Sequence, residues 1–428
     1  MYCFPPNQTI FKTPLLPKHQ HTKINMKKVI FLSLFILLSQ ISNAQTTRWR
    51  ATVKTDGGDL PFGLELQKKS KSTYKVFVLN AAERFQTDDA ILTGDSLTIP
   101  ISLFDAQIVA KMSAKVLEGT FSKNKGRKSY TQSPFKATLG YLDRFRTNKM
   151  AILGKPQGKW SVTFTNPTTN KVSDAVGIFQ QKGNVVTGSF LTTTGDYRYM
   201  DGNMVGDSLF LSTFDGSHTF LLRTKVQGDK MVGKFYGNIK GFSLFEANKN
   251  AKAELPDLGK ITYLKEGFDK LSFTFPNEKG ENISLADPQY EGKVVVIQIL
   301  GSWCPNCMDE SNYLAPFYKK NKDKGLEIIG LAYEKTGDDT FFKEKMALLR
   351  KRFGIDYQLL KAGLNSSESA SESLPMLNKI IGFPTTIILD KKGKIRQTHA
   401  GFSGPGTGKY YTDWVNEFES LIDKLLKE

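Results

Sequence analysis

The chain has 428 residues, which is too long for one ordinary domain, so about three domains are expected. Its hydrophobic fraction of 39% and charged fraction of 24% are those of a soluble globular protein and exclude a wholly disordered chain. The formal net charge of +17 arises before residue 256, because residues 256–428 hold equal numbers of basic and acidic side chains.

The first 44 residues have the features of a targeting segment. Residues 26–28 (Met-Lys-Lys) form a basic start, residues 29–38 are a short apolar run, and residues 42–44 (Ser-Asn-Ala) resemble a cleavage site. The run is shorter than the ~20 residues that span a bilayer, so cleavage is favoured over an uncleaved membrane anchor. Residues 1–44 are therefore predicted to be a leader with a secretory signal peptide, with translation starting at Met26.

Residues 46–250 are predicted to form antiparallel β structure, because short alternating runs are separated by turn-forming Gly, Asn and Asp. Four short patterns recur in the same order at a spacing of about 110 residues. This repetition predicts a duplication, with one β-rich repeat at 46–150 and a second at 151–250. Each copy would hold about six strands. The copies could pack as a sandwich or curl into separate barrels, and the sequence does not distinguish these arrangements.

The β-rich region shows no catalytic pattern. Its recurring Gly-Asp-Ser, at 94–96 and 206–208, is a turn signature rather than a ligand set. Trp49 and Trp160 could line a cleft, but alternating strands normally bury such rings. The excess of basic residues would suit nucleic acid, an acidic glycan or an anionic membrane. An exported protein meets little nucleic acid, so a solvated lysine-rich surface is expected instead.

Residues 251–268 are predicted to be a linker because they combine Pro256 with two glycines. The domain that follows, 269–428, alternates strand and helix patterns and starts with a hairpin at 271–285. The apolar run at 294–300 is typical of a central strand covered on both faces. The remaining strands are predicted at 326–333, 357–360, 384–390 and 395–401, and the helices at 308–321, 338–353, 367–381 and 413–427. The protein is thus expected to be multidomain, with an α/β sandwich after the β-rich region.

The chemistry of the chain is predicted to lie in a Cys-x-x-Cys motif, Cys304 to Cys307, between the 294–300 strand and the next helix. A helix N-terminus carries partial positive charge and unpaired N–H groups, so it stabilises a thiolate. In such a motif, the pKa of the first thiol falls from ~8.5 to roughly 3.5–7.5. The first thiolate can then attack a disulfide, and the second sulfur resolves the mixed disulfide.

The cysteine count supports a redox role for this pair. Cys304 and Cys307 are the only cysteines outside the predicted leader, which contains Cys3. Two cysteines so close in sequence close too small a loop to staple a long exported chain. A zinc site would need two further ligands, whereas His218 and His399 lie in different predicted domains. Neither a metal nor a cofactor is therefore expected.

These residues resemble the thioredoxin fold, and specifically the TlpA-like and ResA-like exported thiol–disulfide oxidoreductases. The resemblance rests on Trp303 before the Cys-x-x-Cys motif, on Gly-Phe-Pro-Thr at 382–385 and on Asp-Lys-Lys-Gly at 390–393. It covers about residues 268–428 and does not extend to the β-rich region. It implies that Cys304 attacks a substrate disulfide and that Cys307 resolves the intermediate.

The resemblance also implies roles for the residues around the pair. Pro384 would be a cis-proline that faces the dithiol, and backbone groups of Phe383 would pair with an extended substrate. Trp303 would shield the site, and Pro305 belongs to the same docking set. The alternative is a trans Pro384 that merely begins a strand.

One position departs from the thioredoxin pattern. Thioredoxins carry a buried Asp six residues before the first Cys, but this chain has Gln298, and an amide cannot accept a proton as a carboxylate does. ResA-like relatives carry a Glu three residues after the second Cys, which Glu310 matches. Either Glu310 handles protons, or Asp309 and Glu310 only interact favourably with the helix dipole.

The sequence therefore predicts an exported, periplasmic protein-disulfide reductase. It would act on a protein disulfide or thiol and be reduced by a membrane-linked thiol donor, with no nucleic-acid partner. One alternative is a binding protein in which the β-rich region does the work and the redox domain is accessory. Another is a thiol peroxidase, but the Pro-x-x-x-Thr-x-x-Cys pattern of peroxiredoxins is replaced by Ile297 and Gly301 before Cys304.

Overall fold

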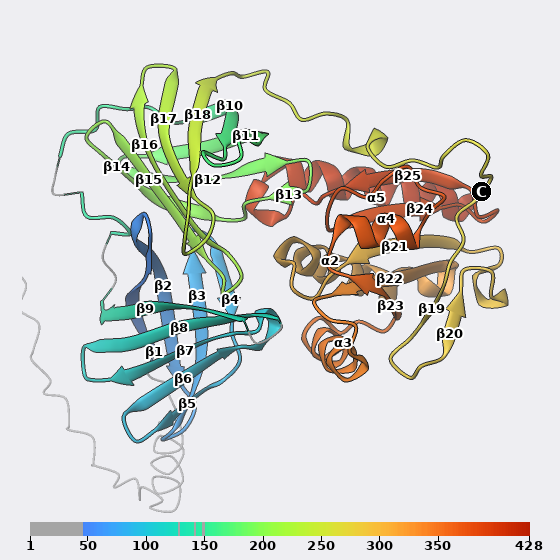
Figure 1. Ribbon diagram of the computed structural model, residues 1–428, viewed down its shortest axis with the longest axis horizontal. Coiled ribbons are helices and arrows are strands. Elements are labelled where there is room, and N and C mark those ends of the chain that lie inside the picture. The colour runs from blue at the N-terminus through green and yellow to red at the C-terminus, as the bar shows by residue number, and fades with distance from the viewer. Residues whose placement is uncertain (1–45, 127–128, 141–142, 148–149) are drawn as a thin grey trace, which may run out of the picture. The chain divides into compact units, whose positions relative to one another are not determined.

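A computed structural model describes residues 46–428, apart from 127–128, 141–142 and 148–149. The predicted leader, with its start at Met26 and its apolar run, lies outside the described residues. Contacts group Thr46–Glu428 into a single unit, which begins with β structure and ends with a mixed sheet and helices (Figure 1). Within the described part of the chain, no helix has both the length and the apolar character needed to cross a bilayer.

The first nine strands form one antiparallel sheet that closes into a barrel. Their order is β2-β1-β9-β8-β7-β6-β5-β3-β4, and a further pairing of β2 with β3 closes the ring. β4 pairs with β3 and lies beside the ring. The bounds are β1 (Thr46–Thr55), β2 (Gly58–Lys68), β3 (Thr73–Asn80), β4 (Glu83–Gln86), β5 (Ala90–Thr93), β6 (Ser96–Ile101), β7 (Ala106–Met112), β8 (Val116–Gly126) and β9 (Ser129–Leu139).

The next nine strands form a second barrel with the same topology. Their order is β11-β10-β18-β17-β16-β15-β14-β12-β13, and a pairing of β11 with β12 closes the ring. The predicted antiparallel β structure is confirmed, as two sheets of nine strands rather than about six, in each of which eight strands close the ring and a short ninth, β4 or β13, pairs beside it. The bounds are β10 (Gly158–Thr165), β11 (Val172–Lys182), β12 (Val185–Thr192), β13 (Gly195–Asp196), β14 (Met200–Val205), β15 (Ser208–Phe214), β16 (Thr219–Gln227), β17 (Lys230–Tyr236) and β18 (Ser243–Lys249).

Alternating side chains fill the interior of each barrel. In β1, the inward positions include Trp49 and Val53, and in β10 they include Trp160 and Val162. Trp49 is 2% exposed and Trp160 is fully buried, so both rings belong to the core rather than to a cleft.

Glycines occupy matching positions in the two barrels. Gly94 and Gly206 both have a φ of +63°, the left-handed region that favours glycine, in the turns β5–β6 and β14–β15. A Cβ on Gly119 would lie 2.0 Å from a backbone oxygen of the neighbouring strand, and one on Gly233 would lie 2.1 Å from such an oxygen. The patterns that repeat in the sequence thus mark places where each barrel needs the same backbone geometry.

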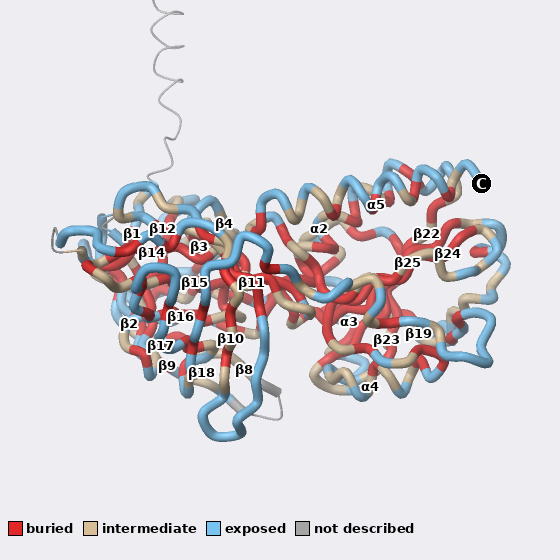
Figure 2. Tube along the Cα trace, turned by 90° about the horizontal axis from the view of Figure 1, so that it is seen from above, coloured by how far each residue is buried: buried red, intermediate tan, exposed pale blue. Residues whose placement is uncertain are grey.

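The C-terminal part is a five-stranded sheet of order β23-β22-β21-β24-β25. β21, β22 and β23 are parallel, and β24 and β25 are antiparallel to their neighbours. β21 is buried at every position, as expected for a central strand, and Figure 2 shows β22 and β24 buried as well. The strands are β21 (Val294–Leu300), β22 (Leu326–Glu334), β23 (Gln358–Leu364), β24 (Thr385–Leu389) and β25 (Ile395–Ala400), preceded by the hairpin β19 (Thr274–Pro276) and β20 (Asn282–Ser284).

Four helices accompany this sheet. They are α2 (Pro305–Asn321), α3 (Asp339–Phe353), α4 (Ser367–Ser373) and α5 (Lys409–Lys427). The helix predicted at 367–381 ends at Ser373, because Pro375 disfavours a helical conformation for Leu374 before it. Tyr313 of α2 packs edge-on against Trp414 and Phe418 of α5, so these two helices lie together.

The second half of the predicted linker packs against the C-terminal part. Thr262 is buried and donates a hydrogen bond to the carbonyl of Lys379 at 3.0 Å, and Leu264 forms a β-bridge with Leu377. The chain is therefore attached to the sheet domain several residues before 269, and the predicted domain boundaries remain approximate.

Candidate functional site

Cys304 and Cys307 lie where β21 ends and α2 begins. Cys304 is the N-cap of α2, and its Sγ accepts a hydrogen bond from the backbone N–H of Cys307 at 3.4 Å. The helix begins at Pro305, three residues earlier than predicted, because proline fits the first helical position. The dithiol loop is thus itself the first turn of the helix.

The two thiols are free and differ in their surroundings. Cys304 is 6% exposed, whereas Cys307 is fully buried. Burial raises the pKa of the Cys307 thiol well above its usual value, and the neighbouring Cys304 raises it further. Cys304 therefore lies at the helix N-terminus and keeps a slight contact with solvent. Cys307 is a protonated thiol in the interior.

The predicted docking residues gather around Cys304. The Phe383–Pro384 peptide bond is cis, as the resemblance implied. The Cys304 thiol donates a hydrogen bond to the carbonyl of Phe383 at 3.4 Å. The Phe383 ring stands edge-on to Trp303 at 5.3 Å, and the Trp303 indole N–H donates to the carbonyl of Tyr333 at 2.8 Å. The structure thus brings Trp303, Phe383 and Pro384 to the first cysteine.

Gln298 and Glu310 form a buried hydrogen-bonded pair behind the dithiol. The Gln298 amide donates to Glu310 Oε2 at 2.7 Å and to the carbonyl of Cys307 at 3.4 Å. Thr386 donates to the other carboxyl oxygen at 2.5 Å. Burial raises the pKa of Glu310 to about 7, although the hydrogen bonds from Thr386 and Gln298 oppose this shift. A carboxyl group with a pKa near neutrality can both take up and release a proton at physiological pH.

A second buried carboxyl, which the sequence analysis missed, holds the loop before the dithiol. Glu334 accepts hydrogen bonds from the backbone N–H of Ser302 at 2.9 Å and from its hydroxyl at 2.7 Å. Burial raises the pKa of Glu334, although both bonds from Ser302 oppose this effect. The only sequence signal is its place directly after the strand predicted at 326–333.

The second barrel also contacts the dithiol loop. The Asn306 amide donates to the carbonyl of Asp196 at 3.1 Å, and the Ser217 hydroxyl donates to the carbonyl of Trp303 at 3.4 Å. Asp196 belongs to β13, and Ser217 lies in the turn between β15 and β16. These contacts join residues about 90 to 110 positions apart, so no local pattern could have revealed them.

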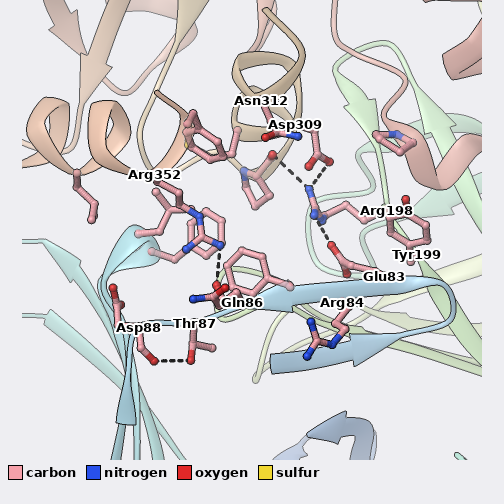
Figure 3. A pocket seen from close by; sticks show the side chains of 18 of the residues that line it. Glu83, Arg84, Gln86, Thr87, Asp88, Arg198, Tyr199, Asp309, Asn312 and Arg352 are labelled. Atoms are coloured by element: carbon pink, nitrogen blue, oxygen red, sulfur yellow. Dashed lines mark hydrogen bonds and ion pairs between the residues drawn. The ribbon is translucent and has the colours of Figure 1, made fainter. Parts of the chain in front are cut away.

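Arg198, in the loop after β13, is buried among three carboxylates. It forms ion pairs with Glu83 beside the first barrel and with Asp309 of α2 (Figure 3). It forms a further ion pair with Asp215 of the second barrel. It also donates to the carbonyl of Pro305 at 3.3 Å. Burial alone would lower the pKa of Arg198, but the three carboxylates raise it well above its usual value. Arg198 is therefore a permanent cation that links both barrels to the dithiol helix.

A cleft of about 760 Å³ opens beside this cluster. Its walls include β4, the Arg198 loop and helices α2 and α3, and Figure 3 shows Asp309 and Asn312 facing Gln86 and Arg352 across it. Arg352 donates to the carbonyl of Gln86 at 2.6 Å and so joins α3 to β4. Within the described residues, no group of three or more His, Cys, Asp or Glu side chains is placed to hold a metal ion.

Comparisons with known proteins match the C-terminal region. Residues 265–413 match the family model described as Redoxin. The thiol-disulfide oxidoreductase ResA of Bacillus cereus is 27% identical over 161 residues, which cover 38% of this chain and 79% of ResA. The thiol:disulfide interchange protein DsbE of Escherichia coli K12 is 29% identical over 143 residues, which cover 33% of this chain and 65% of DsbE. These relatives cover the C-terminal region only.

Solved structures are similar over the same part of the chain. The thioredoxin domain of a thiol-disulfide oxidoreductase from Bacteroides vulgatus is 25% identical, with a TM-score of 0.27, and the match covers 36% of this chain and 99% of that one. A secreted thiol-disulfide isomerase from Corynebacterium glutamicum is 21% identical, with a TM-score of 0.30, and the match covers 41% of this chain and 97% of that one.

Proposed function

We propose that this chain, in which residues 265–413 form a Redoxin domain, is an exported protein-disulfide reductase that works through Cys304 and Cys307. The observation that carries the proposal is the asymmetry of the pair. One free thiol caps a helix next to a cis-proline, and the other is buried behind it. The relatives named as thiol-disulfide oxidoreductases support the same chemistry.

The reaction transfers two electrons from the dithiol to a substrate disulfide. The Cys304 thiolate attacks one substrate sulfur, the substrate S–S bond breaks, and the departing thiolate takes a proton. Cys307 loses its proton to Glu310, which Gln298 links to the cysteine backbone. Cys307 then attacks the Cys304 sulfur, forms the Cys304–Cys307 disulfide and releases the second substrate thiol. An external thiol donor at the membrane restores the dithiol.

The residues around Cys304 have docking and positioning roles in this proposal. The backbone of Phe383 and Pro384 would pair with an extended substrate segment, and Trp303 would limit solvent access to the mixed disulfide. Pro305 begins α2 and thereby places Cys304 at the N-cap. The near-neutral pKa of Glu310 and its burial favour proton handling over a purely dipolar role.

Export and duplication are also part of the proposal. Export rests on the leader-like pattern of residues 1–44. An internal duplication of the barrels is supported by their shared strand order and by the matching glycines.

Reduction of insulin by dithiothreitol, followed by turbidity, tests the proposed function. Catalytic amounts of the mature protein should accelerate precipitation, and the Cys304→Ser variant should return the rate to that of dithiothreitol alone. Full activity in Cys304→Ser would refute the assignment. The matched control is Ser272→Ala, which removes an exposed hydroxyl from the same domain and leaves both thiols in place.

A binding role for the barrels is the second candidate, and the contacts of Asp196 and Ser217 with the dithiol loop favour it. If the barrels bind partners on their own, the double variant Cys304→Ser with Cys307→Ser should capture the same proteins from a native cell extract as the wild-type protein does. Loss of those partners together with the thiols would leave the barrels without an independent binding role.

A further inference from the structure

The segment after β12 lies against two glycines next to the dithiol. A Cβ placed on Gly382, which precedes Phe383, would be 2.6 Å from Cγ2 of Thr194. A Cβ on Gly401, at the end of β25, would be 2.6 Å from the backbone nitrogen of Gly195. The second barrel therefore touches the backbone of the cis-proline loop and of its neighbouring strand so closely that neither position has room for a side chain.

Polar contacts fix the same segment on the dithiol side. The backbone N–H of Gly404 donates to Asp196 Oδ2 at 2.6 Å, and Asn306 donates to the carbonyl of the same residue. A Cβ on Gly195 would lie 2.0 Å from Nδ2 of Asn306. Asp196 is thus held by one group from the Cys-x-x-Cys loop and by one from the segment after β25.

This packing leaves little of the reactive face open. Cys304 is 6% exposed, Phe383 is 8% exposed, and Pro384 is buried. A substrate sulfur must come into contact with the Cys304 sulfur for exchange to occur. Residues 194–196 pack on the backbone next to Phe383 and Pro384, where an extended substrate segment would have to lie.

An ion pair holds residues 194–196, here called the cover, against the dithiol domain. Arg198 lies two residues after the cover. Of its three carboxylate partners, Asp309 belongs to the dithiol helix α2. The Arg198 side chain is 6% exposed and that of Asp309 is 22% exposed, so water screens their interaction only in part. Burial raises the pKa of Asp309 to about 7, although Arg198 opposes this shift, so the charged pair is most complete above neutral pH. Removing one member of a buried ion pair lowers stability far more than removing one member of an exposed ion pair. The other contacts of the cover are single hydrogen bonds or van der Waals contacts.

We infer that the second barrel closes the dithiol site from within the same chain, and that Arg198, through its ion pairs with Asp309 and Glu83, is the clasp that keeps it closed. The inference rests on the proposed function, because it concerns access to the same thiols. Reduction of a protein disulfide then requires the cover to leave the backbone beside the cis-proline. Glu83, Arg198 and Asp309 all line the cleft of Figure 3, so the clasp can be reached from solvent.

Maleimide labelling of Cys304 in the fully reduced mature protein, which lacks Cys3, tests the clasp. The measured quantity is the rate with a maleimide–polyethylene glycol conjugate divided by the rate with N-ethylmaleimide. Both reagents carry the same electrophile, so a change in the reactivity of the thiolate cancels and the ratio reports steric access. Asp309→Asn should raise this ratio at least about tenfold, which corresponds to roughly 1.4 kcal/mol.

Two further variants keep the test decisive. Glu83→Gln breaks the clasp from the side of the first barrel and should raise the ratio in the same direction, even where Asp309→Asn folds poorly. Glu278→Gln is the matched control, because it breaks an ion pair with Arg350 that lies within the C-terminal domain. The control should leave the ratio unchanged. Circular dichroism and thermal unfolding establish that each variant is folded.

The outcomes separate the clasp from the proposed function. An unchanged ratio in folded Asp309→Asn and Glu83→Gln would overturn the inference, even if the wild-type protein reduces insulin. A raised ratio would support the clasp, even if insulin reduction by the wild-type protein fails and the proposed function falls. If both hold, Asp309→Asn should increase the rate of insulin reduction more than the rate with a small aromatic disulfide.

Discussion

The two barrels have one topology but contact the C-terminal domain through different loops. Asp105, which follows β6 in the first barrel, forms ion pairs with Lys335 and Lys345. Asp215 follows β15, the strand at the corresponding place in the second sheet, and forms an ion pair with Arg198 of its own barrel. The carboxylate after this strand therefore binds the C-terminal domain directly in the first barrel, and it orients the clasp residue Arg198 in the second.

Two barrels of the same strand order therefore make different contacts with the C-terminal domain. We call the first barrel the anchor, because its ion pairs with the C-terminal domain lie away from the dithiol, whereas the second barrel carries the cover. The contacts of the first barrel lie on α3 and on the residue after β22, and Arg352 adds its bond to Gln86. Those of the second barrel lie on the Cys-x-x-Cys loop and beside the cis-proline. Strand order is shared, so the loops determine which face of the dithiol domain each barrel meets.

The largest effects are expected from the two core tryptophans. Trp49→Ala and Trp160→Ala each remove a buried ring, and each should lower the free energy of unfolding by about 3–5 kcal/mol in urea titrations. Only Trp160→Ala should also raise the ratio of bulky to small maleimide labelling at Cys304, because it loosens the barrel that covers the dithiol. An equal rise in Trp49→Ala would break the distinction between anchor and cover.

Removal of the anchor carboxylate should destabilise the protein without opening the dithiol. Asp105→Asn leaves Lys335 and Lys345 as uncompensated and largely buried cations, so a loss of about 3 kcal/mol is expected in the same titrations. The labelling ratio should stay at its wild-type value. A rise as large as that in Asp309→Asn would mean that both barrels cover the site.

Glu310 provides a reference inside the dithiol domain. Its pKa is raised from 4.5 to about 7, so the folded protein binds this proton more tightly than the unfolded chain does. This contribution therefore lowers stability as pH rises from about 4.5 to about 7, by on the order of 3 kcal/mol. Glu310→Gln should remove this contribution from the pH dependence of unfolding and slow the resolving attack by Cys307. An unchanged pH dependence of unfolding would contradict the assigned proton binding.

The smallest effects are expected at the matching turns. Gly94→Ala and Gly206→Ala force a side chain into the left-handed region at a φ of +63°, at a cost of about 1–2 kcal/mol each. Asparagine at the same positions should be tolerated better, because it adopts this conformation more readily. Thermal unfolding should show similar losses in the two barrels, and a loss confined to one of them would argue against a shared turn geometry.

Much of the dithiol domain could be predicted because its signals are local. The apolar run at 294–300, the Cys-x-x-Cys spacing and the hairpin turn at 277–280 are each contained in a few residues. The cis geometry at Pro384 and the nearness of Glu310 to the dithiol came from the family resemblance. Hydrophobic periodicity does not locate the start of α2, which Cys304 sets as the N-cap, or the end of α4, which is set by Pro375.

The barrels and the clasp could not be predicted because they depend on distant pairings. Closure of each ring requires particular strands to meet, and β13 has only two residues, too few for any periodicity. Arg198 meets Glu83 across 115 positions and Asp309 across 111. A single arginine in a loop gives no sequence signal for such partners. Its burial depends on contacts that form only when both barrels are folded.

In the proposed reaction, Cys304 attacks the substrate disulfide and Cys307 resolves the mixed disulfide. The decisive measurement is mass spectrometry, under non-reducing conditions, of Cys307→Ser incubated with native, disulfide-bonded insulin. One mixed disulfide per chain is expected, at Cys304; it should accumulate in this variant and be absent from Cys304→Ser. Equal adducts in both variants, or an adduct only at Cys307 when Cys304 is replaced, would contradict the proposed reaction.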